Sequence, residues 1–383
     1  MTTAGGSKLN HETLRVYWHD DCMLHDGGDS VLENEPPACI VMPEPHVETA
    51  MRLLNIKGML ETGPLQDRVD MRIGRHATDD EILTFHTPAY LEEIKAADAD
   101  PEPVRIDGGG TVVADGTLDA AMAAAGTTLD AMHAVMNEPG GAVFSLVRPP
   151  GHHAQPHMGD GNCIFNNVAL AVESARTQGA EKVAVIDWDV HHGNGTQAGF
   201  YDRADVLTIS MHMNHGTWGP NHPELGLADE IGRGAGIGFN RNVPLPYGVG
   251  NDCYEAVLTD LVTPLIDDFA PTVIVVAAGE DANAFDPNGR MVVTMDGFRR
   301  MGLIARDLAA RHCEGRLLLV QEGGYAPTYT AYAAEGMLEG VLGLTEGLLV
   351  DPIGYYPDRS EHGLAALPEI RAEWARADAG ARP

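Results

Sequence analysis

The sequence has few of the features that mark several common protein classes. Its five cysteines are scattered and include no CxxC pair, so neither a disulfide framework nor a cysteine zinc site is indicated. The N-terminal residues lack a charged-then-apolar signal, and the most apolar runs, such as VIVVAAG, are too short to cross a bilayer. We therefore expect a soluble, cytoplasmic protein that has no membrane partner.

Positive charge is also scarce. The chain has 25 Lys and Arg against 56 Asp and Glu, which gives a formal net charge of −31. Because nucleic-acid binding needs clustered basic residues to neutralise phosphates, we do not expect a nucleic-acid ligand. The acidity favours a cationic ligand, although it would equally serve solubility or life in salt.

Two common families of catalytic loop are missing. Neither GxxxxGK[ST] nor a GxGxxG between strand and helix occurs, and the run GRGAGIG at 232–238 has the wrong spacing. The nucleophile elbow GxSxG of serine hydrolases is absent too. We therefore expect neither a nucleotide-binding phosphate loop nor a serine hydrolase. A metal-dependent reaction fits the residues that are present.

The apolar runs predict the fold class. Five of them end abruptly in glycine or polar clusters and alternate with helical stretches: GAVFSLVRPPGHH, KVAVIDWDVHHGNG, DVLTISMHM, PTVIVVAAGEDAN and RLLLVQEGGY. Such alternation indicates an α/β fold with a mainly parallel sheet and helices on both faces. Sites in these sheets form beyond the carboxyl ends of the strands, which is where the His, Asp and Tyr residues lie.

The chain shows no linker-like change of composition between about 12 and 350. We expect one catalytic domain over 12–350 and a C-terminal extension, 351–383, that packs on it or trails from it. The last residues, 375–383, are expected to be frayed. The Pro- and Gly-rich stretches 97–116 and 215–238 are expected to be long surface loops.

A metal site is indicated by the segment VIDWDVHHGNGTQ at 185–197. Asp189 and His191 lie two residues apart just after an apolar strand, so both side chains project to the same side. Asp281 follows another strand and supplies a third ligand. Two carboxylates and one imidazole leave a position open for water, which is typical of catalytic zinc, and iron(II) suits the same donors.

Acid–base groups follow other strands. The segment RPPGHHA supplies His152 and His153, which can take a proton from water and give one to a leaving group. Asp187 and Asn194 flank the metal ligands and are candidates for fixing the tautomers of these imidazoles. In EGGY, Tyr325 follows two glycines, where its phenol can reach a developing oxyanion.

In this order, the segments RPPGHHA, CIFNNVALA, DWDVHHGNGTQ, GEDANAFDPNGRM and QEGGY resemble the zinc-dependent histone deacetylase superfamily. The nearest branch is that of class II-like bacterial histone deacetylase-like amidohydrolases and acetylpolyamine amidohydrolases. The resemblance extends from VYWHDDCMLHD at 16–26 to about residue 340. It implies the arginase/deacetylase-like three-layer fold and hydrolysis of an acylated amine such as an acetylated lysine, polyamine or related small molecule.

The resemblance also implies a role for each acid–base residue. His153 would be the general base and acid and would pair with Asn194, the choice of class II members. His152 would be an electrostatic partner that is hydrogen-bonded to Asp187. Tyr325 would polarise the scissile carbonyl and stabilise the tetrahedral oxyanion.

Two ions are implied by the same resemblance. One zinc ion would be held by Asp189, His191 and Asp281. A structural potassium ion would be held by Asp187 and Ser210 and by main-chain oxygens of Asp189, His191 and Met211. Gly193 and Asn283 stand where the two-metal arginases carry further carboxylates, so a dinuclear ureohydrolase is not expected.

The expected substrate tunnel departs from the family pattern. After Gly161, Asn162 replaces the usual aromatic residue, and Glu280 replaces the Phe of the bacterial branch. Trp218 is expected to supply an apolar wall from another angle. These changes leave open a hydrolase of a specialised small-molecule amide or ester. A non-catalytic metal-binding scaffold is disfavoured because His152, His153 and Tyr325 are all retained. We further expect a cationic substrate and a homo-oligomer.

Overall fold

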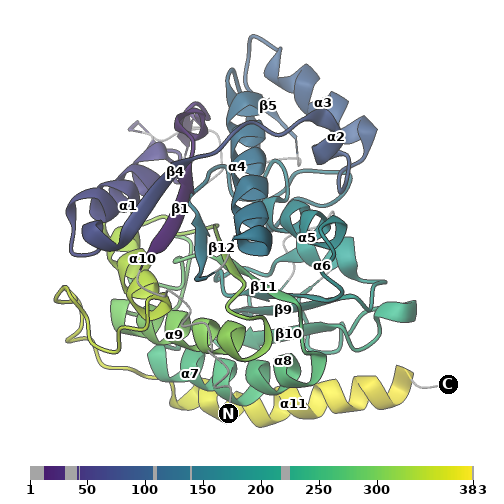
Figure 1. Ribbon diagram of the computed structural model, residues 1–383, viewed down its shortest axis with the longest axis vertical. Coiled ribbons are helices and arrows are strands. Elements are labelled where there is room, and N and C mark those ends of the chain that lie inside the picture. Colours follow the sequence, from purple (N-terminus) through teal and green to yellow (C-terminus); the bar gives the residue numbers. More distant parts are fainter. Residues whose placement is uncertain are drawn as a thin grey trace, which may run out of the picture.

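The centre of the protein is an eight-stranded parallel sheet with the strand order β10-β9-β8-β11-β12-β7-β1-β4 (Figure 1). The computed structural model describes residues 13–30, 41–42, 44–106, 110–138, 140–216 and 225–381. The strands of the sheet are β1 (Leu14–Trp18), β4 (Val69–Ile73), β7 (Val143–Ser145), β8 (Val183–Asp187), β9 (Val206–Met213), β10 (Asn240–Leu245), β11 (Val273–Ala278) and β12 (Leu317–Gln321).

The central strands are buried on both faces, which explains their near-continuous apolar sequences. In β8, Val183 and Val185 enter one hydrophobic core, whereas Ala184 and Ile186 enter the core on the opposite face. This alternation follows from the two-residue period of a strand. The sheet is therefore the middle layer of three, as the sequence predicts.

Helices cover both faces of the sheet (Figure 1). One face is covered by α4 (Thr117–Asn137), α5 (Asn167–Thr177) and α6 (Asn194–Phe200). The other is covered by α1 (Ala50–Thr62), α7 (Asn251–Ala256), α8 (Thr263–Phe269), α9 (Met295–His312) and α10 (Pro327–Val341), with a π-helical turn at Val257–Val262 between α7 and α8. The shorter helices α2 (Asp79–Ile82) and α3 (Pro88–Asp98) lie beside α4.

The five apolar runs that the sequence singles out form β7, β8, β9, β11 and β12, and helices lie between these strands along the chain, as the sequence predicts. The outer strands β1, β4 and β10 were not identified from the sequence. In β4 every residue is at least partly exposed, so the strand lacks the continuous apolar run on which the prediction depended.

Parallel register brings the ends of separate motifs together at one edge of the sheet. Asp187 of β8 is opposite Ser210 of β9, and Ala278 of β11 is opposite Gln321 of β12. The residues that follow these strands therefore start from neighbouring positions, and this edge carries the candidate site.

The stretches expected to be long surface loops are partly structured. Within 97–116, β5 (Val104–Arg105) pairs with β6 (Val112–Val113), and residues 107–109 lie outside the described part of the chain. Within 215–238, Gly234–Gly236 form a 3-10 turn, and residues 217–224 lie outside it. Across the described residues, no helix combines the length and the apolar character that a bilayer crossing requires.

The C-terminal residues differ from the expectation of a frayed end. The helix α11 runs over Glu361–Ala381 and packs against α7 and β10, along the lower edge of Figure 1. Its Trp374 is buried and donates a hydrogen bond from Nε1 to the Asn242 carbonyl at 3.0 Å. Asp378 pairs with Arg241 at 2.9 Å, so the anchored side chains extend the helix into the segment expected to be loose.

We expect Trp374→Ala to lower the free energy of unfolding by about 3–5 kcal/mol, because it removes a large buried ring and a hydrogen bond. Urea denaturation followed by circular dichroism measures the change. Arg376→Ala is the matched control, since Arg376 lies two residues away with an exposed side chain and should change stability by less than about 0.5 kcal/mol. Equal stability of the two variants would show that α11 does not anchor through this ring.

Candidate active site and metal centre

Asp189, His191 and Asp281 form a compact buried cluster. Each offers one ligand atom, and these atoms all lie within 4.8 Å of one another. His191 Nδ1 is 3.1 Å from Asp189 Oδ1 and 3.1 Å from Asp281 Oδ2. Asp189 and His191 come from the loop after β8, and Asp281 comes from the loop after β11.

Backbone groups hold the two carboxylates in place. Asp189 Oδ1 accepts from the His191 amide at 2.9 Å, and Asp281 Oδ1 accepts from the Val190 amide at 2.7 Å. Asp189 Oδ2 accepts from the Gly323 amide at 2.8 Å, so the loop after β12 contacts the cluster as well. Three loops are therefore joined at one pair of carboxylates.

Glycine is required where the backbone approaches these carboxylates. A Cβ added at Gly323 would lie 2.1 Å from Asp281 Oδ2, and one at Gly279 would lie 2.2 Å from Asp189 Oδ2. Burial raises the pKa of Asp281, and the neighbouring Asp189 carboxylate raises it further. A divalent cation would relieve this crowding of negative charge, and two carboxylates with one imidazole suit zinc or iron(II). The residues present therefore fit a metal ion.

The adjacent histidines have different partners. His152 Nδ1 is 2.9 Å from Asp187 Oδ2, and His153 Nδ1 is 2.6 Å from Asn194 Oδ1. Asn194 donates from Nδ2 to Asp160 Oδ2 at 2.8 Å, which leaves its carbonyl oxygen facing His153. His153 must then carry its proton on Nδ1, so Nε2 is the acceptor nitrogen of the ring.

The environment of His153 favours its neutral form. Burial lowers the pKa of His153 well below its ordinary value, and the imidazoles of His152 and His191 lower it further. Gly161 has a φ of +51°, and a Cβ there would lie 2.4 Å from the His153 ring. Gly161 therefore lets the loop pack directly against the general-base candidate.

Tyr325 is held by its backbone and by a cation. Its amide donates to Asp286 Oδ2 at 2.6 Å, and the Arg52 guanidinium carbon lies 4.6 Å from the centre of its ring. Burial raises the pKa of the Tyr325 phenol well above its ordinary value, against the effect of Arg52. The phenol is therefore a hydrogen-bond donor at neutral pH.

The residues expected to hold potassium lie close to the metal cluster. Asp187 and Ser210 face each other across β8 and β9, and the Asp189 amide donates to Asp187 Oδ1 at 3.1 Å. Ser210 Oγ accepts from the Gly193 amide at 3.3 Å. Met211 is fully buried in β9. The potassium assignment stays a prediction.

The expected tunnel residues are placed differently from one another. Asn162 is 6% exposed, has a φ of +67°, and donates its amide to Thr111 Oγ1 at 3.1 Å. Glu280 was also expected in the tunnel. It is fully buried, and its Oε2 accepts a hydrogen bond from Gln321 Nε2 at 2.6 Å. Trp218 lies outside the described residues.

Four residues that support the site were missed. Asp160 and Asp286 bind Asn194 and the Tyr325 backbone as described above, and Arg52 covers the Tyr325 ring. Glu322 Oε2 accepts from the Gly151 and His152 amides at 2.6 and 3.1 Å. The three acidic residues lie inside or beside the motif segments, and this position was the only sequence feature that could have pointed to them. Their hydrogen-bond partners could not be predicted, because these come from distant loops.

His192, which is adjacent to a metal ligand in the sequence, points elsewhere. Its Nε2 is 2.8 Å from Gln197 Oε1, and its ring lies 4.8 Å from that of His212. Of the two histidines of DVHH, His191 therefore belongs to the metal cluster, whereas His192 contacts Gln197 and His212.

The comparisons with known proteins identify a family that matches most of the chain. Residues 46–341 match the family model described as histone deacetylase domain. The chain is 46% identical over 358 residues to histone deacetylase 8 of Arabidopsis thaliana, covering 93% of this chain and 95% of that protein. It is 38% identical to a histone deacetylase-like amidohydrolase of Pseudomonas aeruginosa, covering 88% of each. A crystal structure of the HDA15 HD domain is 30% identical with a TM-score of 0.77, and the match covers 96% of this chain and 98% of that one.

We expect Gly323→Ala to weaken metal binding strongly, because the added Cβ would displace Asp281 and Asp189. Elemental analysis after incubation with Zn²⁺ measures the metal retained per chain. Gly58→Ala in α1 is the control, since a Cβ there meets nothing within 4 Å and alanine favours a helix. Full metal content in Gly323→Ala would show that the carboxylates have more room than this packing allows.

Proposed function

Since this chain belongs to the histone deacetylase family, whose members hydrolyse amide bonds, we propose that it removes a small acyl group from an acylated amine with the help of one zinc ion. The observation that carries the proposal is the meeting of three groups in one buried site. These are the Asp189–His191–Asp281 cluster, the neutral imidazole of His153, whose ring centre lies 5.9 Å from that of His191, and the phenol of Tyr325, whose pKa is raised by burial and by the charges of Asp189 and Asp281.

Asp189, His191 and Asp281 would hold the zinc. Bound there, zinc supplies Lewis-acid activation of a water molecule and of the acyl carbonyl. The buried setting supports this chemistry, because charges interact more strongly where bulk water is excluded.

In the proposal His153 moves the protons. With its Nδ1 proton fixed on Asn194, its Nε2 takes a proton from the attacking water and later gives it to the amine nitrogen as the C–N bond breaks. Asn194 is itself hydrogen-bonded to Asp160. The imidazolium formed between these steps is therefore connected to the Asp160 carboxylate through the Asn194 amide. His152, which is hydrogen-bonded to Asp187, acts as the electrostatic partner of His153.

Tyr325 would stabilise the tetrahedral oxyanion. Its phenol donates a hydrogen bond to the acyl oxygen as negative charge develops there. The bond from its amide to Asp286 and the Arg52 guanidinium over its ring fix the side chain at the turn after Gly324. This role requires a protonated phenol, which agrees with its burial.

The substrate is proposed to be a compact, cationic acylated amine. The net charge of −31 favours a positively charged ligand. A second candidate, a specialised small-molecule amide or ester, is favoured by Asn162. Its Oδ1 is buried and has no hydrogen-bond partner among the described residues, so it is suited to a polar group of the substrate. A structural potassium ion at Asp187 and Ser210, a homo-oligomer and a cytoplasmic location complete the proposal.

We expect Tyr325→Phe to retain zinc and fold while kcat falls by about 10²–10³-fold, the usual effect of removing one oxyanion donor. Turnover of a fluorogenic acetyl-lysine amide, with and without chelator, provides the measurement. Tyr247→Phe is the matched control, because Tyr247 is half exposed and its hydroxyl has no role in the mechanism. Near-normal turnover by zinc-loaded Tyr325→Phe, or activity of the wild type that survives complete zinc removal, would overturn the mechanism.

We expect the wild type to prefer a compact acylated amine over acetyl-lysine peptides, and Asn162→Phe to shift the ratio of kcat/KM toward the peptides by about two- to tenfold. Asn162→Gly is the control, because glycine accepts the positive φ but brings no aromatic wall. A wild type that already prefers the peptides, or an unchanged ratio in Asn162→Phe, would remove Asn162 as a determinant of specificity.

A further inference from the structure

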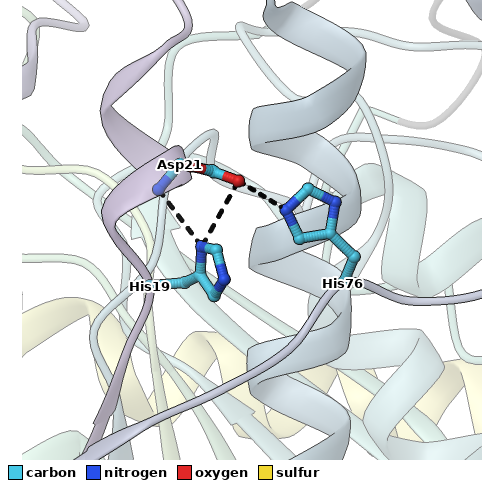
Figure 2. Close-up of side chains that lie close together, drawn as sticks. All are labelled: His19, Asp21 and His76. Atoms are coloured by element: carbon cyan, nitrogen blue, oxygen red, sulfur yellow. Dashed lines mark hydrogen bonds and ion pairs between the residues drawn. The ribbon is translucent and has the colours of Figure 1, made fainter.

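A second group of metal-ligating side chains lies away from the candidate active site. Figure 2 shows the rings of His19 and His76 on either side of the Asp21 carboxylate. His76 Nε2 is 2.7 Å from Asp21 Oδ2, and His19 Nδ1 is 3.8 Å from the same oxygen. One ligand atom from each of the three residues lies within 4.8 Å of the others.

The fold itself brings these residues together. His19 and Asp21 follow β1, and His76 follows β4, its parallel neighbour, in which Ile73 is opposite Trp18. The Gly74 amide donates to the Trp18 carbonyl at 2.9 Å, which extends the pairing to the residues that precede the cluster. The side chains are therefore presented by two adjacent strand ends.

The donor atoms are close to the spacing that a metal ion needs. Bonds of about 2.0–2.2 Å to nitrogen and oxygen place tetrahedral donors about 3.3–3.6 Å apart. The distances from Asp21 Oδ2 to the two imidazole nitrogens, 2.7 and 3.8 Å, bracket this value. Shifts of less than an ångström are enough, and the side chains are 20–41% exposed, so they can adjust and an ion can reach them from solvent.

The charges around the cluster do not oppose a cation. Arg75 is adjacent to His76, but its guanidinium is engaged by Glu81 at 2.7 Å and by Asp130 at 3.0 Å. Asp20 accepts from Trp18 Nε1 at 2.8 Å and adds a further negative charge close by. The carboxylates in this region therefore balance its arginine.

We propose that His19, Asp21 and His76 bind a divalent transition-metal ion of the zinc class at a site separate from the catalytic centre. Two imidazoles and one carboxylate are borderline donors that suit Zn²⁺, Ni²⁺ and Cu²⁺ and do not suit Ca²⁺ or Mg²⁺. In the sheet order β1 is four places from β8 and three from β11, so its end lies about 14–19 Å from the strand ends that precede Asp189, His191 and Asp281, at about 4.8 Å per strand. The nearer strand β7, which precedes His152 and His153, is adjacent to β1.

Binding displaces two existing interactions. The ion takes the position between His76 Nε2 and Asp21 Oδ2 that a hydrogen bond now occupies, and the His76 proton leaves to solvent. If His19 binds through Nδ1, that nitrogen gives up the bond it accepts from the Asp21 amide at 3.1 Å. These losses weaken binding, and the bound ion would join the 3-10 turn Asp20–Met23 to the segment after β4.

The test is calorimetric titration of Zn²⁺ into full-length enzyme that already carries one equivalent of zinc. We expect one further equivalent to bind, and Ca²⁺ or Mg²⁺ not to compete at tenfold excess over Zn²⁺. His76→Ala and Asp21→Asn should each weaken this second event by at least about tenfold, while deacetylase turnover and the first equivalent of zinc stay unchanged. Because Asp21→Asn nearly preserves side-chain size, it keeps the test valid if His76→Ala misfolds.

His312→Ala is the matched control. His312 Nε2 forms a close pair with Asp267 at 2.6 Å, as His76 does with Asp21, but among the described residues this pair belongs to no group of three metal-ligating side chains. We expect its second binding event to match that of the wild type. No second equivalent in the wild type, or full retention of it in folded His76→Ala or Asp21→Asn, would overturn the proposal. So would its loss in His312→Ala, which would place the ion elsewhere.

Discussion

The carboxylate of Asp189 is the point on which the organisation of the active site depends. It accepts hydrogen bonds from His191 in its own loop and from Gly323 in the loop after β12, and it lies against Gly279 after β11. The first two contacts are made by backbone amides, and at Gly323 and Gly279 a side chain would collide with the carboxylates. The parallel register of β8, β11 and β12 supplies this convergence, because it brings their carboxyl ends to the same edge. A metal ion bound at Asp189 would therefore join loops that the sheet has already brought together.

A buried ionic network links this centre to α1. Glu48 accepts from Arg52 Nη1 at 2.6 Å and from Arg148 Nη2 at 2.7 Å, and all three side chains are almost completely excluded from solvent. Arg52 also donates to the Glu322 carbonyl at 2.6 Å and covers the Tyr325 ring. Removing one partner would leave a buried charge unpaired, which is strongly destabilising, whereas the intact ion pairs add little net stability. The network therefore holds the EGGY turn in place mainly because breaking it is unfavourable.

The sequence was sufficient to predict the layers, because they depend on local signals, whereas the roles of the candidate reacting residues stay predictions. Continuous apolar runs identify doubly buried strands, and the chemistry lies directly after them. The supporting contacts were not predictable in this way. The bond of Asp160 to Asn194 spans 34 residues and that of Asp286 to the Tyr325 amide spans 39, so only the folded chain pairs them. The expectation that 375–383 are frayed was wrong for a related reason, since Asp378 is held by its ion pair with Arg241, which is 137 residues away in the sequence.

The two polar departures from the family pattern have different physical meanings once their partners are known. Glu280 Oε2 accepts a hydrogen bond from Gln321, its Oε1 has no partner among the described residues, and burial raises the pKa of this carboxyl group well above its ordinary value. Asn162 differs in its backbone, which is held in a left-handed conformation that asparagine tolerates better than most residues. Its amide oxygen, like Glu280 Oε1, lacks a partner among the described residues. A buried acceptor without a partner is unfavourable unless a ligand satisfies it. Both side chains have such an acceptor, so the proposal that Asn162 faces the substrate depends on its place next to Gly161, which packs against the His153 ring.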